Sequence, residues 1–325
     1  MGLRKLALMG AAIVAAGIAT AANAQGPNEQ FIPGLIYRTG AYAPNGIPFA
    51  NGVADYYALV NERDGGINGV KIAYEECDTA YATDRGVECY ERLKGKGATG
   101  AAYVLPLSTG ITFALTEKAP VDKIPIISMG YGRSESRDGS VFEWNFPLLG
   151  TYWSAADIIM QHIALKEGGF EKLKGKKVVL VYHDSPYGKE PIALLEQRAK
   201  LHGFEFTPMA VTHPGVEQKA TWLQIRQNRP DYVLLWGWGI ENLDLSAARL
   251  KELGFEGMLQ PLKVTCADHE GTRAGRIQQW DGAKWVVVSD WYQSDDKVIK
   301  PMVDAAAKKY AEEKKLPVRD CSKES

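Results

Sequence analysis

The sequence predicts an α/β protein of two similar lobes, each built around a parallel sheet flanked by helices. From residue 31 onward, short apolar runs alternate with longer amphipathic runs, a pattern typical of parallel strands joined by helices. The alternation pauses near Pro147 and then starts again, which indicates a second unit. A chain of 325 residues is long enough for two such cores.

Apolar runs and helical periodicity define the elements of the first lobe, which we place at residues 25–147. Its strands are expected at residues 31–37, 70–75, 101–105 and 124–128. Its helices are expected at residues 50–61, 84–94 and 109–118. The glycine-rich stretch 65–69 is a turn that ends the first helix.

The second lobe, at residues 148–287, repeats the pattern. Its helices are expected at residues 152–166, 189–202, 218–228 and 242–253. Its strands are expected at residues 177–182, 205–210, 232–236 and 258–261, with a further strand at 284–291. A charged helix at 295–315 belongs to a segment, 288–325, that returns to the first lobe. Without a low-complexity linker, residues 146–152 must cross directly between the lobes.

The amino terminus has the three parts of a secretory signal. Arg4 and Lys5 precede an apolar stretch, and Ala22-Asn23-Ala24 before Gln25 has the form of a signal-peptidase site. A membrane anchor is the alternative, but the apolar stretch is rich in Ala and Gly and weakly hydrophobic. We therefore expect residues 1–24 to be removed and the mature protein to be periplasmic.

Charge and composition exclude several classes of protein. Lys and Arg total 38 against 39 Asp and Glu, a net charge of -1, which lacks the positive field that nucleic-acid binding requires. Hydrophobic residues at 46% and charged residues at 24% argue against a disordered chain. No nucleic-acid partner is expected.

Export permits disulfides among the four cysteines. Cys77 ends an apolar strand and Cys89 lies on the following helix, so these two are the expected pair, with two unpaired buried thiols as the alternative. The pairing of Cys266 and Cys321 stays open. No Cys-x-x-Cys motif is present, so zinc and thiol-redox sites lack their strongest signal.

A binding site is expected where the carboxyl ends of the two sets of strands face each other. One strand runs into a Ser/Thr-rich loop at a helix start, with Ser108, Thr109, Gly110 and Thr112. Hydroxyls and free backbone N–H groups there suit a carboxylate or phosphate, although helix capping also selects Ser and Thr.

The next strand end carries a second group of candidates, Gly130, Tyr131, Gly132 and Arg133. Glycines allow close backbone approach, and Arg133 has the fork geometry that grips a carboxylate. Arg38, at the end of the first strand, is the competing cation, and a plain surface arginine is the alternative for Arg133.

Aromatic residues gather at the same predicted strand ends. Singly, each ring is better explained by packing, but six near one rim favour a wall for a flat apolar ligand. The six are Tyr42, Tyr103, Tyr131, Tyr187, Trp236 and Trp238.

Catalytic and metal patterns are absent from the sequence. There is no Gly-x-Ser-x-Gly elbow and no phosphate-loop lysine, and the five histidines show no metal spacing. We expect neither an enzyme nor a cofactor or metal.

A family resemblance follows from several motifs in order. Thr39-Gly40, Asn51-Gly52, the turn 65–69, Cys77-Asp78 and Tyr187-Gly188 resemble the branched-chain amino-acid-binding type of periplasmic substrate-binding protein of ABC transporters. The resemblance spans residues 31–315. It implies a two-lobe type I periplasmic-binding-protein fold, a small-molecule ligand, a membrane permease as partner and a monomer.

The resemblance also implies roles for particular residues. In that family the lobes close on the ligand as a hinged trap, and a Ser/Thr-rich loop and the next strand end hold its carboxylate. The matching positions are residues 108–112 and 130–133. The family's second-lobe tyrosine matches Tyr187, and its next aromatic contact falls near Trp236 or Trp238.

Two departures from the family pattern matter. Amino-acid binders place an acidic residue where this chain has Leu262-Lys263-Val264, and a buried ammonium without a carboxylate is strongly penalised. The sequence therefore resembles the branch that binds aromatic acids of the hydroxycinnamate or benzoate kind. A binder of branched-chain amino acids, short amides or urea, and a periplasmic sensor domain of the same fold are the alternatives.

The second departure concerns the carboxyl terminus. Family members continue past Ser325, which implies a truncated or altered carboxyl terminus.

Overall fold

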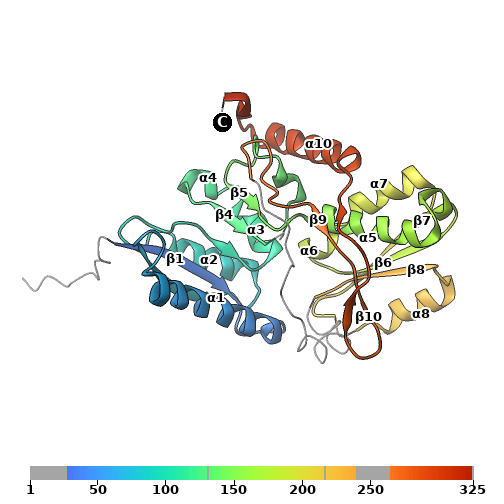
Figure 1. Ribbon diagram of the computed structural model, residues 1–325, viewed down its shortest axis with the longest axis horizontal. Helices are drawn as coiled ribbons and strands as arrows, with labels where there is room; N and C mark the ends of the chain where they lie inside the picture. The colour runs from blue at the N-terminus through green and yellow to red at the C-terminus, as the bar shows by residue number, and fades with distance from the viewer. Residues whose placement is uncertain (1–27, 130–131, 216, 239–263, 324–325) are drawn as a thin grey trace, which may run out of the picture.

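The computed structural model describes residues 28–129, 132–215, 217–238 and 264–323. An amino-terminal lobe beginning with strand β1 (Glu29–Ile36) and a carboxyl-terminal lobe beginning with helix α5 (Tyr152–Glu167) lie side by side (Figure 1). The α/β fold in two lobes is confirmed. The expected signal segment 1–24, helix 242–253 and strand 258–261 lie outside the described residues.

Parallel strands form the amino-terminal sheet. Strand β1 lies between β2 (Lys71–Asp78) and β3 (Leu105–Pro106), and β4 (Ile126–Ser128) pairs with β5 (Asn145–Pro147). A parallel bridge between Val104 and Ile126 joins the two groups. The strand expected at 101–105 is thus reduced to isolated bridges at Ala101 and Val104 and two paired residues, the second of which, Pro106, has no N–H to donate.

Helices pack on this sheet and complete its core. They are α1 (Ala43–Asp64), α2 (Thr83–Leu93), α3 (Thr109–Leu115), α4 (Ala119–Asp122) and the 3₁₀ helix η1 (Ser134–Arg137). Leu35, Tyr90 and Leu115 are fully buried between sheet and helices. Helix α1 begins at Ala43 rather than at residue 50, because a proline in the first turn is compatible with a helix.

The carboxyl-terminal lobe repeats the arrangement. Its parallel sheet has the order β7 (Glu205–Val211), β6 (Lys177–His183), β8 (Tyr232–Trp236). Its further helices are η2 (Phe170–Leu173), α6 (Pro186–Lys189), α7 (Ile192–His202) and α8 (Lys219–Asn228). Val178 and Leu180 of β6 pack with Met160 of α5 and Leu194 of α7 in the buried core.

The last part of the chain differs from the single strand expected at 284–291. Only β11 (Trp285–Val287) forms there, antiparallel to β10 (Gln278–Trp280), and β12 (Tyr292–Gln293) pairs with β9 (Ala274–Gly275). A turn explains the hairpin, since the Asp281 carboxylate accepts the N–H groups of Ala283 and Lys284.

Helix α10 (Asp296–Lys314) contacts both lobes (Figure 1). Ile299 and Val303 belong to the core of the carboxyl-terminal lobe. Near the other end of the helix, Tyr310 stacks on Phe142 of the amino-terminal lobe, with ring centroids 4.9 Å apart. No helix in the described part of the chain combines the length and apolar character of a membrane span.

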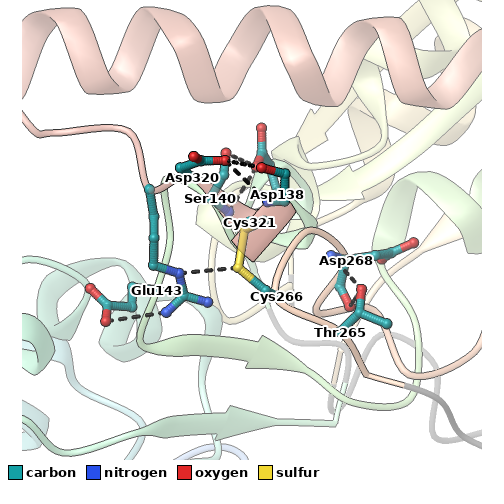
Figure 2. The surroundings of a disulfide bond; sticks show 10 residues. Asp138, Ser140, Glu143, Thr265, Cys266, Asp268, Asp320 and Cys321 are labelled. Atoms are coloured by element: carbon teal, nitrogen blue, oxygen red, sulfur yellow. Dashed lines mark hydrogen bonds and ion pairs between the residues drawn. A yellow bond between two sulfur atoms is a disulfide. The ribbon is translucent and has the colours of Figure 1, made fainter. Parts of the chain in front are cut away.

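Two disulfides are present. Cys77 of β2 is joined to Cys89 of α2, with Cα atoms 5.7 Å apart. Cys266 is joined to Cys321 of η4 (Cys321–Lys323), with Cα atoms 5.5 Å apart (Figure 2). Beside it, the Arg319 guanidinium pairs with Glu143 at 3.2 Å and its backbone N–H donates to the Ser140 carbonyl. The tail is therefore fixed to the amino-terminal lobe.

Buried charges hold the connections between the lobes. The Glu270 carboxylate accepts the Thr151 N–H at 2.9 Å and the Ser154 hydroxyl at 2.6 Å, at the start of α5. Burial raises the pKa of Glu270 to about 7. Arg137 is 4% exposed and pairs with Asp296 at 2.7 Å and Asp268 at 3.3 Å, so one cation ties α10 and the segment before β9 to η1.

Candidate functional site

A pocket of about 190 Å³ lies between the lobes. The amino-terminal lobe contributes Tyr81, Thr83, Ser108 and Gly110 to its lining. The carboxyl-terminal lobe contributes His183, Asp184, Ser185, Pro186, Tyr187 and His213. These residues follow strands β2, β3, β6 and β7, so the pocket lies at the carboxyl ends of both parallel sheets.

Small polar groups form the wall of the pocket that the amino-terminal lobe contributes. Ser108 is the N-cap of α3, and its hydroxyl accepts the Ile111 N–H at 3.5 Å. A Cβ atom on Gly110 would lie 2.6 Å from the Thr83 hydroxyl, so the glycine leaves room between the two loops. Helix α3 has only seven residues, so the hydroxyls of Ser108 and Thr83, rather than a long helix dipole, set the polarity of this wall.

The opposite wall is the tight turn after β6. Ser185 caps α6 and accepts the Gly188 N–H at 3.3 Å, while Nδ1 of His183 lies 2.7 Å from the Ser185 hydroxyl. Asp184 is turned toward Lys189, at 2.7 Å. The capping serine therefore also orients the His183 ring.

A contact between the lobes borders the pocket. The hydroxyl of Tyr42, from the amino-terminal lobe, lies 2.6 Å from Nε2 of His183 and is also hydrogen-bonded to Nδ1 of His213. Tyr42 is 1% exposed and His183 is 2% exposed. Burial, and to a lesser extent His213, lowers the pKa of His183 to about 4, against an opposing effect of Asp184.

Aromatic rings extend from the pocket into the carboxyl-terminal lobe. Tyr187 lies 5.2 Å from the ring of Tyr152 and 6.1 Å from that of Trp236, and its hydroxyl donates to the Gly237 carbonyl at 2.9 Å. Trp238 packs against the cluster of the amino-terminal lobe that holds Tyr42. The structure thus brings four of the expected aromatic residues together: Tyr42, Tyr187, Trp236 and Trp238.

The two candidate arginines are engaged elsewhere. Arg38 pairs with Glu76 through Nε at 2.6 Å and donates to Asn51 at 2.7 Å. Arg133 pairs with Glu135 at 2.9 Å. Its guanidinium also lies over three rings, those of Tyr310 at 4.3 Å, Phe113 at 4.7 Å and Phe142 at 5.3 Å. Neither arginine is among the described residues that line the pocket.

The remaining candidates divide between the pocket wall and other places. Tyr103 is hydrogen-bonded to Tyr57 in a separate cluster around Ile32. The Thr112 hydroxyl donates back to the Ser108 carbonyl at 3.0 Å. Thr109 is buried beside α5, with its hydroxyl 3.4 Å from that of Tyr152. Gly130 and Tyr131 lie outside the described residues.

Gly132 shows why a glycine follows β4. Its φ is +61°, and a Cβ there would lie 2.6 Å from Cγ2 of Thr109. The glycine therefore permits the β4 loop to approach the start of α3, as expected for close backbone packing.

Sequence reasoning missed part of the pocket lining. Tyr81, Thr83 and His213 follow β2 and β7, two strand ends that the search for motifs left aside. The histidines show no metal spacing in the sequence, and His183 instead forms a hydrogen bond between the lobes. In the described part of the chain, no group of three or more His, Cys, Asp or Glu residues is arranged to hold a metal.

The sequence profile of the periplasmic binding protein family matches residues 29–310. The chain belongs to this family. This periplasmic binding protein is 33% identical to a protein of the Pseudomonas fluorescens group whose crystal structure is described as an ABC transporter permease. The match covers 91% of this chain and 100% of that chain, with a TM-score of 0.78. The resemblance seen in the motifs is confirmed.

Two more distant structures share the fold. One is a branched-chain amino acid ABC transporter protein of Thermus thermophilus with bound valine, 15% identical, over 84% of this chain and 98% of that chain, with a TM-score of 0.68. The other is an ABC transporter solute-binding protein of R. palustris in complex with benzoate, 20% identical, over 68% and 59%, with a TM-score of 0.55. None of the curated proteins matches the chain in sequence.

Proposed function

We propose that this protein is the periplasmic solute-binding component of an ABC importer and that it binds a small aromatic carboxylate between its lobes. The observation that carries the proposal is the pocket itself, in which Ser108 and Gly110 face Ser185 and Tyr187 from the other lobe. A ligand there touches both lobes, so its binding favours the closed arrangement.

The chemistry of the lining suits an aromatic acid. Hydroxyls of Ser108, Thr83 and Ser185 are donors for a carboxylate, and the Tyr187 ring, backed by Tyr152 and Trp236, offers an apolar face. The volume of about 190 Å³ is below the range of about 300–1,000 Å³ typical of drug-sized ligands. A ligand with a single ring is therefore favoured.

Proteins of the same fold support this ligand class. One R. palustris structure contains benzoate, and another contains 3,4-dihydroxy benzoic acid. The proposal includes a cleaved signal at 1–24, a membrane permease as the partner, a monomer as the working form, and binding without chemical conversion of the ligand.

A second candidate is an α-amino acid, and Asp184 favours it. Its carboxylate lies in the lining and has the charge to pair with an ammonium. Against it, Asp184 already pairs with Lys189 at 2.7 Å. Residues 262 and 263, where the acidic partner was expected to be missing, lie outside the described residues.

A thermal-shift screen of the mature protein tests the proposal. Because a ligand that binds only the native state stabilises it, benzoate, 4-hydroxybenzoate and 4-hydroxycinnamate should raise Tm in proportion to the logarithm of their concentration. Benzamide, urea, leucine and valine serve as comparisons. A larger shift with leucine or valine than with any aromatic acid would establish the amino-acid alternative instead.

A further inference from the structure

We infer that an aromatic carboxylate enters this pocket together with one proton, which the imidazole of His183 takes up. The inference rests on the proposed function. It adds that a protonated imidazole balances the negative charge of the bound carboxylate, and this makes the affinity for the ligand depend on pH.

The two imidazoles are joined through one phenol. The Tyr42 hydroxyl contacts Nε2 of His183 at 2.6 Å and also Nδ1 of His213, and both histidines line the pocket. A phenol has one hydrogen to donate, so it donates to one ring nitrogen and accepts from the N–H of the other.

When His183 is protonated, each of its two ring N–H groups has a hydrogen-bond acceptor. Nδ1 of His183 lies 2.7 Å from the Ser185 hydroxyl, which accepts the Gly188 N–H and has a second lone pair. An imidazolium at His183 can thus donate to Ser185 through Nδ1 and to Tyr42 through Nε2. His213 is exposed, which provides a route for the proton from solvent.

The described lining residues include no lysine or arginine to balance the charge of a carboxylate. Arg38 and Arg133 pair with Glu76 and Glu135. Among the described lining residues, the two histidines are the side chains able to become cationic. A carboxylate beside them favours the charged imidazole. The other ionisable groups facing them are Asp184, paired with Lys189, and the phenols of Tyr42, Tyr81 and Tyr187.

Without a bound anion, a proton on His183 is disfavoured. Burial and, to a lesser extent, His213 lower the pKa of His183 to about 4. Proton uptake is therefore linked to arrival of the anion. Between the pKa of the empty pocket and that of the occupied pocket, affinity for the acid should fall up to about tenfold for each unit rise in pH.

Calorimetry with benzoate measures this linkage directly. Titrations of the mature protein at pH 6.5 in two buffers of low and high ionisation enthalpy give the number of protons taken up per benzoate. We expect a value approaching one for the wild type. His183→Gln keeps a hydrogen-bonding group near Nε2 without a titrating ring and should reduce the value toward zero.

A matched control uses a histidine outside the pocket. His162 lies on α5 and its Nδ1 is 3.1 Å from the Tyr292 hydroxyl, so His162→Gln should leave proton uptake at the wild-type value. If His183→Gln does not fold, His183→Asn provides the second variant.

The possible outcomes distinguish failure of the proton-uptake inference from failure of the proposed function. Benzoate binding with the same heat in both buffers would overturn the inference and leave the proposed function standing. Proton uptake that survives in a folded His183 variant would also overturn it. Failure of benzoate and the two hydroxylated acids to bind folded protein between pH 5 and pH 8 would overturn the proposed function itself.

Discussion

The hydroxyl of Tyr42 lies 2.6 Å from Nε2 of His183, and this contact joins the two lobes at the edge of the pocket. Tyr42 is the N-cap residue of α1, and His183 is the last residue of β6. Both side chains are almost fully buried. The two lobes therefore touch at this point, and separating them must break this bond.

Replacing Tyr42 with Phe should weaken closure. The change removes one hydrogen-bonding hydroxyl shared by two imidazoles, and a net loss of about 0.5–1.5 kcal/mol corresponds to a roughly 2- to 13-fold loss of affinity for the acid. Calorimetry measures the affinity, and small-angle scattering should show a larger radius of gyration without ligand. Tyr57→Phe, which breaks the hydrogen bond to Tyr103 away from the pocket, should leave affinity unchanged; an equal loss in both variants would contradict the role of Tyr42.

Replacing Gly110 with Ala should impair binding. The new Cβ would lie 2.6 Å from the Thr83 hydroxyl, so Thr83 must shift at the wall of the pocket. Gly52→Ala is a matched control, since a Cβ there meets nothing within 4 Å and alanine in a helix is favoured by about 0.5–1 kcal/mol. Titrations and melting curves should show lost affinity for the first and a raised Tm for the second. Unchanged affinity in Gly110→Ala would place the ligand elsewhere.

The arginines should prove structural. Arg38→Gln should change affinity for benzoate less than twofold, because the guanidinium is held by Glu76 and Asn51. Arg133→Leu should instead lower the free energy of unfolding by about 1–3 kcal/mol, since it leaves Glu135 unpaired and removes the cation from three rings. Urea unfolding and calorimetry check both. A tenfold loss of affinity in Arg38→Gln, with stability kept, would restore Arg38 as a ligand contact.

Stability without ligand should fall in mild acid because of His183. Its folded-state pKa of about 4 lies below the ordinary value of 6.5, so the unfolded chain binds a proton that the native protein does not. The contribution is present above pH 6.5 and is lost as the pH falls toward 4, by up to about 3 kcal/mol. Urea unfolding at pH 7.5 and 4.5 should show a smaller pH dependence in His183→Gln. An identical dependence in both proteins would refute the assignment.

The two disulfides should contribute unequally. Cys266 and Cys321 are 55 residues apart and Cys77 and Cys89 are 12 apart, and a longer loop loses more chain entropy in the unfolded state. In the loop-entropy account the Cys266→Ser/Cys321→Ser pair costs about 4 kcal/mol and the Cys77→Ser/Cys89→Ser pair about 3 kcal/mol. Unfolding by guanidinium compares the two double variants. The reverse order would show that native packing, rather than the unfolded chain, dominates.

The fold was predictable because the repeating pattern is long and local. Strands such as β1 and β6 combine apolar residues with short turns, and their positions agree with the sequence within two residues at either end. The β10–β11 hairpin was missed because its strands are only three residues long. The start of α1 was missed because Pro44 in its first turn and Pro48 further inside are residues that usually mark the end of a helix.

A pocket lies where the sequence predicts a binding site, and the ligand contacts themselves stay a prediction. Ser108, Gly110 and Tyr187 were identified because the carboxyl ends of parallel strands meet in one place. Arg38 and Arg133 were assigned to a ligand because the sequence does not show that Glu76 and Glu135 neutralise them. The partnership of Tyr42 with His183 spans 141 residues and depends on how the lobes meet, which no local pattern encodes.

A crystal structure of the mature protein grown with benzoate tests the central claim most directly. The account predicts one benzoate in the pocket between the lobes, its carboxylate within hydrogen-bonding distance of the Ser108 hydroxyl and its ring against Tyr187. Full occupancy shown by calorimetry, with benzoate bound anywhere else on the protein, would contradict it.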